Sequence, residues 1–132
     1  MVIRFFIFML LFSFKSNAQD SILIKVNVYK TQAKNIGIAS FYANKFNGRK
    51  TSSGEIFYNH KLTAAHKSIK LGSYVIVRNL KNDSTVIVKI NDRLPQRSKR
   101  SIDLSFKAAQ QLNFIKNGLT KVEITVLDSL KK

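Results

Sequence analysis

The sequence predicts a mainly β protein that closes into a small barrel with one short helix. Three observations support this fold class. Two runs of β-branched residues flank the turn-forming segment KNDS, further short apolar runs alternate with polar or glycine-containing segments, and a single stretch has helical spacing. Many short strands with so little helix are typical of a closed β-barrel, in which every strand edge is paired.

The first 18 residues have the layout of a secretory signal peptide. Arg4 precedes an apolar run over positions 5–14, and small residues at 16 and 18 predict cleavage after Ala18. The run is too short for a membrane span, which needs about 20 apolar residues, so an uncleaved anchor is the weaker alternative. We expect a signal peptide over 1–18, a leader with one strand-like segment over 19–35, and one folded domain over 36–128.

The folded domain begins with a predicted strand, GIASFYA, over residues 37–43. A polar, glycine-containing loop follows over 45–55, and an aromatic cluster, IFY, over 56–58. The clearest signal lies in residues 73–92, where the Asn-Asp pair of KNDS suits a tight turn between two β-branched runs. This segment is predicted to be a β-hairpin.

The one predicted helix lies in SIDLSFKAAQQLNF, residues 101–114. Asp103 or Ser105 can serve as its N-cap, and apolar residues recur at positions 104, 108, 109 and 112 with helical spacing. After Gly118, the segment KVEITVL at 121–127 alternates apolar and polar residues and is predicted to be the last strand.

The chain is strongly basic and its sequence contains no cysteine. Its 23 Lys and Arg residues against 7 Asp and Glu residues give a net charge of +16, and removal of Arg4 and Lys15 with the signal leaves +14. Such a charge attracts polyanions, and the export signal argues against nucleic acid as the partner. Without cysteine, disulfides, Cys-based metal sites and lipid attachment at a cysteine are excluded. We expect a monomer without a stable membrane span after signal cleavage.

Three polar clusters end at residues suited to acid–base chemistry: TSSGE at Glu55, LTAAH at His66, and KINDRLP with Asp92 at its centre. Asp92 directly follows the branched apolar run 86–90, so its carboxyl group is expected to be half-buried at the rim of a groove. Burial of that kind raises the pKa of a carboxyl group toward the range used in catalysis. The alternative is a turn residue that interacts with Arg93 or a local backbone N–H.

These clusters stand in a longer pattern. The segments GIASFYANKFNGRKTSSGEIFYNHKLTAAHKSIKLGSYVIVRNL, VIVKINDRLP, SIDLSFKAAQQL and VEITVL occur in this order over residues 37–127. Together they resemble the rare lipoprotein A (RlpA-like) family. The resemblance implies a six-stranded double-psi β-barrel, a fold related to that of expansins and barwin-type plant proteins.

The resemblance also implies an exported lytic transglycosylase that cleaves peptidoglycan between N-acetylmuramic acid and N-acetylglucosamine, preferring strands stripped of peptide stems. Its catalytic residues would be Glu55, His66 and Asp92. Because the muramic acid 6-hydroxyl replaces water and gives a 1,6-anhydro end, one carboxyl group can act first as acid and then as base. We expect this group to be Asp92, protonated at rest. His66 would hydrogen-bond Asp92 or a sugar hydroxyl, and Glu55 would orient the substrate or share the proton transfer.

Substrate contacts are expected from Tyr42, Arg49 and Arg93. Tyr42 would stack on a sugar ring, with packing inside the protein as an equal alternative. The two arginines would meet the lactyl carboxylates of the glycan, and simple solvation is the alternative for each. His60 and His66 lack further ligands at useful spacing, so no metal site and no cofactor are predicted.

Two departures from the family pattern favour a second function. Leu94 stands where the family has glycine in NDRGP, and the following segment, QRSKR, is more basic than the usual loop. A glycine permits a positive φ or close approach of a ligand, which leucine does not. The alternative function is therefore a non-catalytic, expansin-like cell-wall-binding module. For either function the expected location is the periplasm or cell envelope of a Gram-negative bacterium.

Overall fold

The computed structural model describes residues 34–127 of the 132-residue chain, and in this part six strands form a closed barrel. A single turn of 3-10 helix, η1, and one α-helix, α3, accompany them. The elements in chain order are β1 Lys34–Phe41, η1 Asn44–Phe46, β2 Thr63–His66, β3 Tyr74–Asn79, β4 Thr85–Arg93, β5 Ile102–Leu104, α3 Phe106–Gln111 and β6 Thr120–Leu127.

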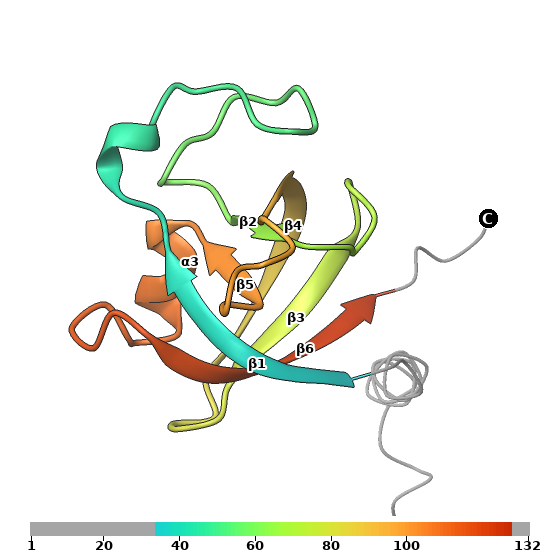
Figure 1. The fold of residues 1–132 in the computed structure, drawn as a ribbon. Coiled ribbons are helices and arrows are strands. Elements are labelled where there is room, and N and C mark those ends of the chain that lie inside the picture. The colour runs from blue at the N-terminus through green and yellow to red at the C-terminus, as the bar shows by residue number, and fades with distance from the viewer. Residues whose placement is uncertain (1–33, 128–132) are drawn as a thin grey trace, which may run out of the picture. The chain divides into compact units, whose positions relative to one another are not determined.

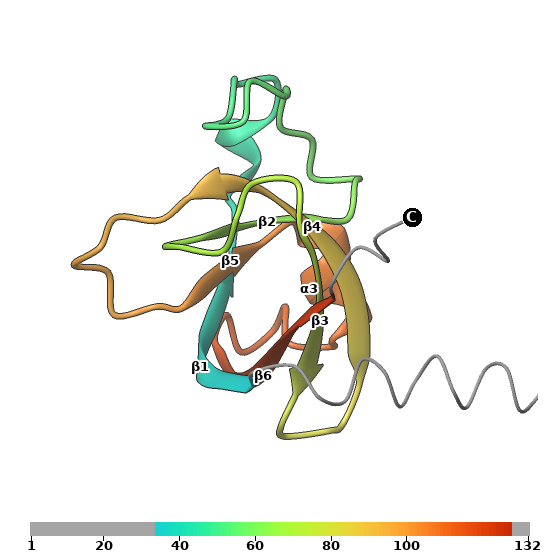
Figure 2. The same cartoon turned by 90° about the vertical axis from the view of Figure 1, so that its right-hand side faces the viewer.

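The order of strands around the barrel is β1-β5-β2-β4-β3-β6, so most neighbours in space are not neighbours in sequence. Two pairs, β1 with β5 and β2 with β4, are parallel, and the other pairs are antiparallel. Figures 1 and 2 show the strands curling around one interior, with α3 packed beside the barrel. The predicted fold class, a mainly β six-stranded barrel with one short helix, is confirmed.

The barrel is held together by one apolar core. In β3, and in β4 as far as Ile90, every second side chain is buried, because successive residues of a strand point to opposite faces of the sheet. The interior side chains are branched or small, and together they fill the space between the strands. They are Ala39, Ala64, Val75, Val77, Val86, Val88, Ile90, Ile102, Leu104, Val122 and Ile124, and Ala108, Ala109, Leu112 and Phe114 join them from α3 and the segment after it.

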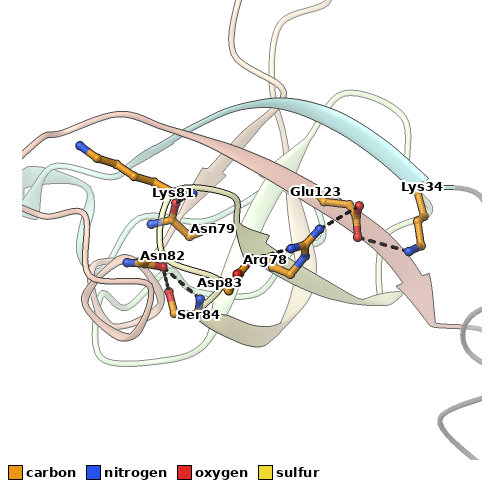
Figure 3. Close-up of polar contacts among 8 residues, drawn as sticks. All are labelled: Lys34, Arg78, Asn79, Lys81, Asn82, Asp83, Ser84 and Glu123. Atoms are coloured by element: carbon orange, nitrogen blue, oxygen red, sulfur yellow. Dashed lines mark hydrogen bonds and ion pairs between the residues drawn. The ribbon is translucent and has the colours of Figure 1, made fainter.

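The predicted hairpin is confirmed as β3 and β4, and charged residues surround its turn. The Asn79 N–H donates to Ser84 O at 2.9 Å, and Asp83 adopts a left-handed φ of 61°. Figure 3 shows the Arg78 guanidinium between Asp83 and Glu123, at 2.6 and 3.3 Å. In Figures 1 and 2 this turn lies at the opposite end of the barrel from the long connection between β1 and β2.

The helix is shorter than predicted. Its N-cap is Ser105, whose Oγ accepts a hydrogen bond from the Ala108 N–H, whereas Asp103 belongs to β5. The segment 102–104 is a strand because both of its edges are paired, with β1 on one side and β2 on the other. These long-range hydrogen bonds outweigh the helical spacing of the local sequence.

Two of the sequence predictions concern the start of the chain. The predicted signal peptide and most of the predicted leader lie outside the described residues. β1 begins at Lys34, inside the last two residues of that leader. Within residues 34–127, no helix is long and apolar enough to cross a membrane.

Candidate active site

Asp92 lies in the last part of β4, where an irregularity changes the direction of the side chains. Opposite β2, Ala64 pairs with Ile90 but Ala65 pairs with Asp92, so Asn91 is an extra residue on the β4 side. Bulges of this kind redirect side chains and often lie beside active sites. As a consequence, Asn91 and Asp92 have different partners, and Asp92 remains half-buried as predicted.

The Asp92 carboxylate accepts four hydrogen bonds. Oδ1 accepts from the Ser52 N–H at 3.0 Å, the Ser52 hydroxyl at 2.9 Å and the Arg93 N–H at 2.9 Å. Oδ2 accepts from the Tyr42 hydroxyl at 2.6 Å. Backbone, serine and tyrosine donors from three parts of the chain therefore fix the orientation of one carboxyl group.

These donors change the expected protonation of Asp92. Burial on its own raises the pKa of this carboxyl group, but the hydrogen bonds from Tyr42, Ser52 and Arg93 outweigh burial and leave the pKa below its ordinary value. The prediction that Asp92 is protonated at rest is therefore wrong. The free protein carries an ionised Asp92 at neutral pH.

The TSSGE segment brings Ser52 to Asp92 because it forms a tight turn. Thr51 donates from its N–H and its hydroxyl to Glu55 O, both at 2.8 Å, and Gly54 adopts a φ of +89°, which favours glycine. The Ser53 N–H donates to Asn91 O at 3.1 Å and joins the turn to β4. The glycine before the glutamate therefore serves the shape of the turn that carries both Ser52 and Glu55.

Glu55 lies on the Asn91 side of this turn. Its carboxylate forms an ion pair with the Lys89 ammonium group and accepts a weaker hydrogen bond from the Asn91 amide at 3.4 Å. The hydrogen bond from Lys89 holds the pKa of Glu55 below its ordinary value. Glu55 is thus an exposed, ionised group suited to orienting a ligand rather than to donating a proton.

His66 ends β2, and its imidazole is held by the backbone that follows it. Nδ1 accepts hydrogen bonds from the Ser68 N–H and the Ile69 N–H, both at 3.1 Å. Burial and then the positive charges of Arg93 and Lys67 lower the pKa of His66. The imidazole is therefore neutral at pH 7 with its proton on Nε2, which is a hydrogen-bond donor.

Arg93 and Leu94 support this arrangement. The Arg93 guanidinium donates from Nη1 to Ile69 O at 2.6 Å and to His66 O at 3.3 Å, so it ties the end of β2 to the following turn. Leu94 is 6% exposed and is not among the described residues with a positive φ. The leucine therefore fits an ordinary backbone conformation and packs inward, so this position does not need the positive φ that a glycine would permit.

Tyr42, which donates to Asp92, and Arg49 both contact neighbouring aromatic rings. The Tyr42 ring stacks on buried Phe57 with 4.3 Å between the ring centroids, and Phe46 meets it edge-on at 5.8 Å. Burial and then the neighbouring Asp92 raise the pKa of Tyr42, so its hydroxyl keeps its proton. The Arg49 guanidinium lies 5.3 Å from the Phe46 ring centroid. Phe57 covers one face of the Tyr42 ring, which favours the packing alternative, and the Tyr42 hydroxyl donates to Asp92.

A groove of about 430 Å³ opens next to Glu55. Its walls carry cations, an amide, a hydroxyl and two partly exposed apolar side chains. The lining residues are Glu55, Ile56, Tyr58, Lys61, Thr63, Lys89 and Asn91. Asp92 and His66 are not among them; on β4 the groove is lined by Lys89 and Asn91, the residue that directly precedes Asp92 in the chain.

The structure thus places the three predicted catalytic residues on adjoining elements. The register of β2 on β4 pairs Ala65 with Asp92 and His66 with Arg93, and the turn that ends at Glu55 docks on the same part of β4. Among the hydrogen bonds of residues 34–127, none joins any two of Glu55, His66 and Asp92. Each is held by partners of its own.

Sequence reasoning missed three of those partners: Ser52, Lys89 and Asn91. The signal for Ser52 and Asn91 was present, since serine next to Gly54 and an Asn-Asp pair at the end of a strand are both typical of turns and bulges. Lys89 is one of many lysines in a basic chain, and nothing in the sequence distinguishes it. The pairing of strands alone brings its ammonium group to Glu55.

We expect Tyr42→Phe to raise the pKa of Asp92, because it removes the hydrogen bond to Oδ2 that stabilises the ionised form. The measurement is an NMR titration of the Asp92 carboxyl carbon in the wild type and the variant. The pH–rate profile should shift to higher pH in the same direction. Tyr74→Phe is the matched control, because Tyr74 is an exposed tyrosine of β3. This variant should change neither the pKa of Asp92 nor the pH–rate profile. An unchanged Asp92 titration in Tyr42→Phe would contradict the assignment.

Comparison with known proteins places this geometry in a family. The family model described as lytic transglycolase matches residues 34–124. The endolytic peptidoglycan transglycosylase RlpA of Pasteurella multocida is 53% identical over 94 residues, which are 70% of this chain and 32% of that protein. The protein of the same name from Haemophilus influenzae is 47% identical over 95 residues, 72% of this chain and 33% of that protein. The chain spans about a third of the length of these curated relatives.

Solved structures share the fold at low sequence identity. The apo expansin of Clavibacter michiganensis matches with a TM-score of 0.60 and 17% identity, over 76% of this chain and 53% of that chain. The Streptomyces papain inhibitor matches with a TM-score of 0.59 and 19% identity, over 73% of this chain and 96% of that chain. These likenesses concern the fold alone. Together with the match to the family model over most of the barrel, they lead to one conclusion: the chain belongs to the lytic transglycolase family of RlpA-like double-psi β-barrels.

Proposed function

We propose that this protein is an exported peptidoglycan lytic transglycosylase that cuts glycan strands between N-acetylmuramic acid and N-acetylglucosamine and leaves 1,6-anhydro ends. The observation that carries the proposal is the half-buried Asp92 carboxyl group, oriented by four donors at a bulge whose extra residue, Asn91, lines a polar groove. Its family membership and relatives named as endolytic peptidoglycan transglycosylases support the substrate class.

One carboxyl group suffices for this reaction because no water is added. Protonated Asp92 gives its proton to the glycosidic oxygen as the bond from that oxygen to C1 breaks. The resulting carboxylate then takes the proton of the muramic acid C6 hydroxyl as its oxygen bonds to C1. The cycle returns Asp92 to its protonated form, and general acid–base catalysis of this kind contributes about 10²–10⁴-fold.

The ionised state of free Asp92 requires that the substrate change its pKa. Burial already raises this pKa and is opposed only by hydrogen bonds. A glycan strand lying over the carboxylate removes further water, so it favours the neutral acid. The Tyr42 hydroxyl and the Ser52 N–H keep the group oriented in either state, and neutral His66 would offer its Nε2 proton to a sugar oxygen. Glu55 would orient the strand from the groove side.

A second candidate, a wall-binding module without catalysis, is favoured by the four hydrogen bonds to the free Asp92 carboxylate, which lower its pKa and favour the ionised form, unable to act as an acid. Incubation with purified sacculi, with and without peptide stems, separates the two functions. The transglycosylase releases soluble glycan fragments, with more from stripped strands, whereas the binding module co-sediments with sacculi and releases none. Retention on sacculi without release at any pH between 4 and 8 would favour the second candidate.

The remaining parts of the proposal concern the setting of the reaction. The predicted signal peptide supports export, and a peptidoglycan substrate supports action in the periplasm or cell envelope of a Gram-negative bacterium. The barrel would act as a monomer on the acidic glycan, toward which its net positive charge steers it. Nucleic acid is not proposed as a partner, because the chain carries an export signal.

A further inference from the structure

The groove beside Glu55 contains a polar group that lacks a partner. Thr63 is 8% exposed and lines the groove, and its Oγ1 is the buried side-chain atom without a hydrogen-bond partner in the described part of the chain. An unpaired buried hydroxyl destabilises a protein, so its presence in a groove points to a ligand that completes it. The backbone of Thr63 is already used, since its carbonyl accepts from the Ser105 N–H at 2.9 Å.

The charges of the groove are unequal. Lys89 is paired with Glu55, so much of its charge is compensated. Lys61 has no ion pair within residues 34–127, and its ammonium group lies 5.2 Å from the centroid of the Tyr58 ring. It is close enough to Glu55 that its charge helps to lower the pKa of that carboxyl group. Lys61 is therefore the uncompensated cation of the groove.

The walls of the groove suit a sugar ring. Tyr58 and Ile56 are 37% and 42% exposed and offer apolar surface. Asn91 and Thr63 also line the groove and carry an amide and a hydroxyl group. Groups of these kinds form hydrogen bonds with the hydroxyl and acetamido groups of a sugar. Binding sites for small polar ligands commonly combine such apolar walls with a few placed polar groups.

We propose that this groove is the subsite for the acidic sugar of the strand, in which Lys61 binds the lactyl carboxylate of an N-acetylmuramic acid residue and Thr63 Oγ1 binds one of its ring substituents. The inference rests on the proposed peptidoglycan substrate and adds the residues that distinguish its two sugars. The groove then sets the register of the strand, because only every second residue carries the carboxylate. A strand fixed in this register presents one type of glycosidic bond to Asp92.

The test compares two soluble tetrasaccharides without peptide: alternating N-acetylglucosamine and N-acetylmuramic acid, and N-acetylglucosamine alone. Binding is measured by calorimetry and NMR in the Asp92→Asn background, so that no ligand is consumed. We expect the acidic tetrasaccharide to bind about tenfold more tightly, and Lys61→Gln to reduce this preference to about twofold or less. Lys81→Gln is the matched control and should keep the preference, because Lys81 lies in the β3–β4 turn (Figure 3), at the opposite end of the barrel from the β1–β2 connection that carries Lys61 (Figures 1 and 2).

A second variant separates binding from folding. Thr63→Val removes the unpaired hydroxyl at nearly constant shape, so we expect weaker binding of the acidic tetrasaccharide, by about threefold to tenfold, with an unchanged or higher melting temperature. An unchanged preference in Lys61→Gln, or no binding of either sugar, would overturn the inference. If wild-type protein fails to cut sacculi while the preference still depends on Lys61, the proposed catalysis fails and the acidic-sugar subsite stands.

Discussion

Asp92→Asn is expected to lower the rate of glycan release by about 10²–10⁴-fold, because an amide can neither give nor take the proton that the reaction moves. The measurement is the initial rate of fragment release from peptide-stripped sacculi. Asp83→Asn is the matched control: Asp83 is an exposed aspartate of the β3–β4 turn, away from the site, and asparagine tolerates its positive φ. The control should retain the wild-type rate.

The fold should survive the Asp92 substitution, since the asparagine oxygen can still accept from Ser52 and the Arg93 N–H while its amide nitrogen donates to the Tyr42 hydroxyl oxygen. The melting temperature and the far-ultraviolet spectrum of Asp92→Asn check this expectation. A folded Asp92→Asn protein that releases fragments at the wild-type rate would show that another group transfers the proton. Asp92 would then be only the anchor of the turn that carries Glu55.

Phe114→Ala is expected to lower the free energy of unfolding by about 3–5 kcal/mol, the largest effect on stability that we predict. Phe114 is 1% exposed in the core, and its ring meets Phe41 edge-on with 5.8 Å between centroids. Truncation leaves a cavity between the segment after α3 and β1. Tyr42 directly follows β1 in the chain. Urea denaturation measures the change.

The control for Phe114 is Leu119→Ala, in the same connection between α3 and β6. Leu119 is 54% exposed, so its truncation should change the free energy of unfolding by no more than about 0.5 kcal/mol. Similar losses for the two variants would mean that the segment after α3 does not belong to the core as described.

The parts of the fold that the sequence predicts are those with strong local signals. The β3–β4 hairpin has alternating branched residues and a turn with Asp83 in a left-handed conformation, so neighbours in sequence alone specify it. The last strand is predicted for the same reason. The N-cap of α3 at Ser105 follows from the ability of a serine hydroxyl to accept from the first turn of a helix.

The short strands β2 and β5 are not predicted, and the reason is physical. All four residues of β2 are buried, so Thr63–His66 has no alternation to detect, and β5 has three residues that pair on both sides with distant strands. Parallel pairing of β2 with β4 is decided by the whole barrel. The same pairing places His66 near Asp92, which local sequence could not show.

For the candidate site, too, the sequence predicts some features, whereas others depend on the folded structure. The three residues Glu55, His66 and Asp92 were selected from motifs that resemble a family, and the barrel places them on adjoining elements. Burial alone predicts a protonated Asp92, and this prediction is wrong because hydrogen bonds oppose burial. The four donors that oppose burial come from the β1 end, the TSSGE turn and β4 itself, and these meet only in the folded protein.

The most direct test of the proposed mechanism is the chemistry of the new glycan end. Peptide-stripped sacculi are digested by the wild-type protein in water labelled with the heavy oxygen isotope, and the soluble fragments are analysed by mass spectrometry. The proposed mechanism predicts muramic acid ends that lack one water molecule and contain no heavy oxygen, because the C6 hydroxyl replaces water at C1. Reducing ends that carry the heavy isotope would show hydrolysis and contradict the mechanism.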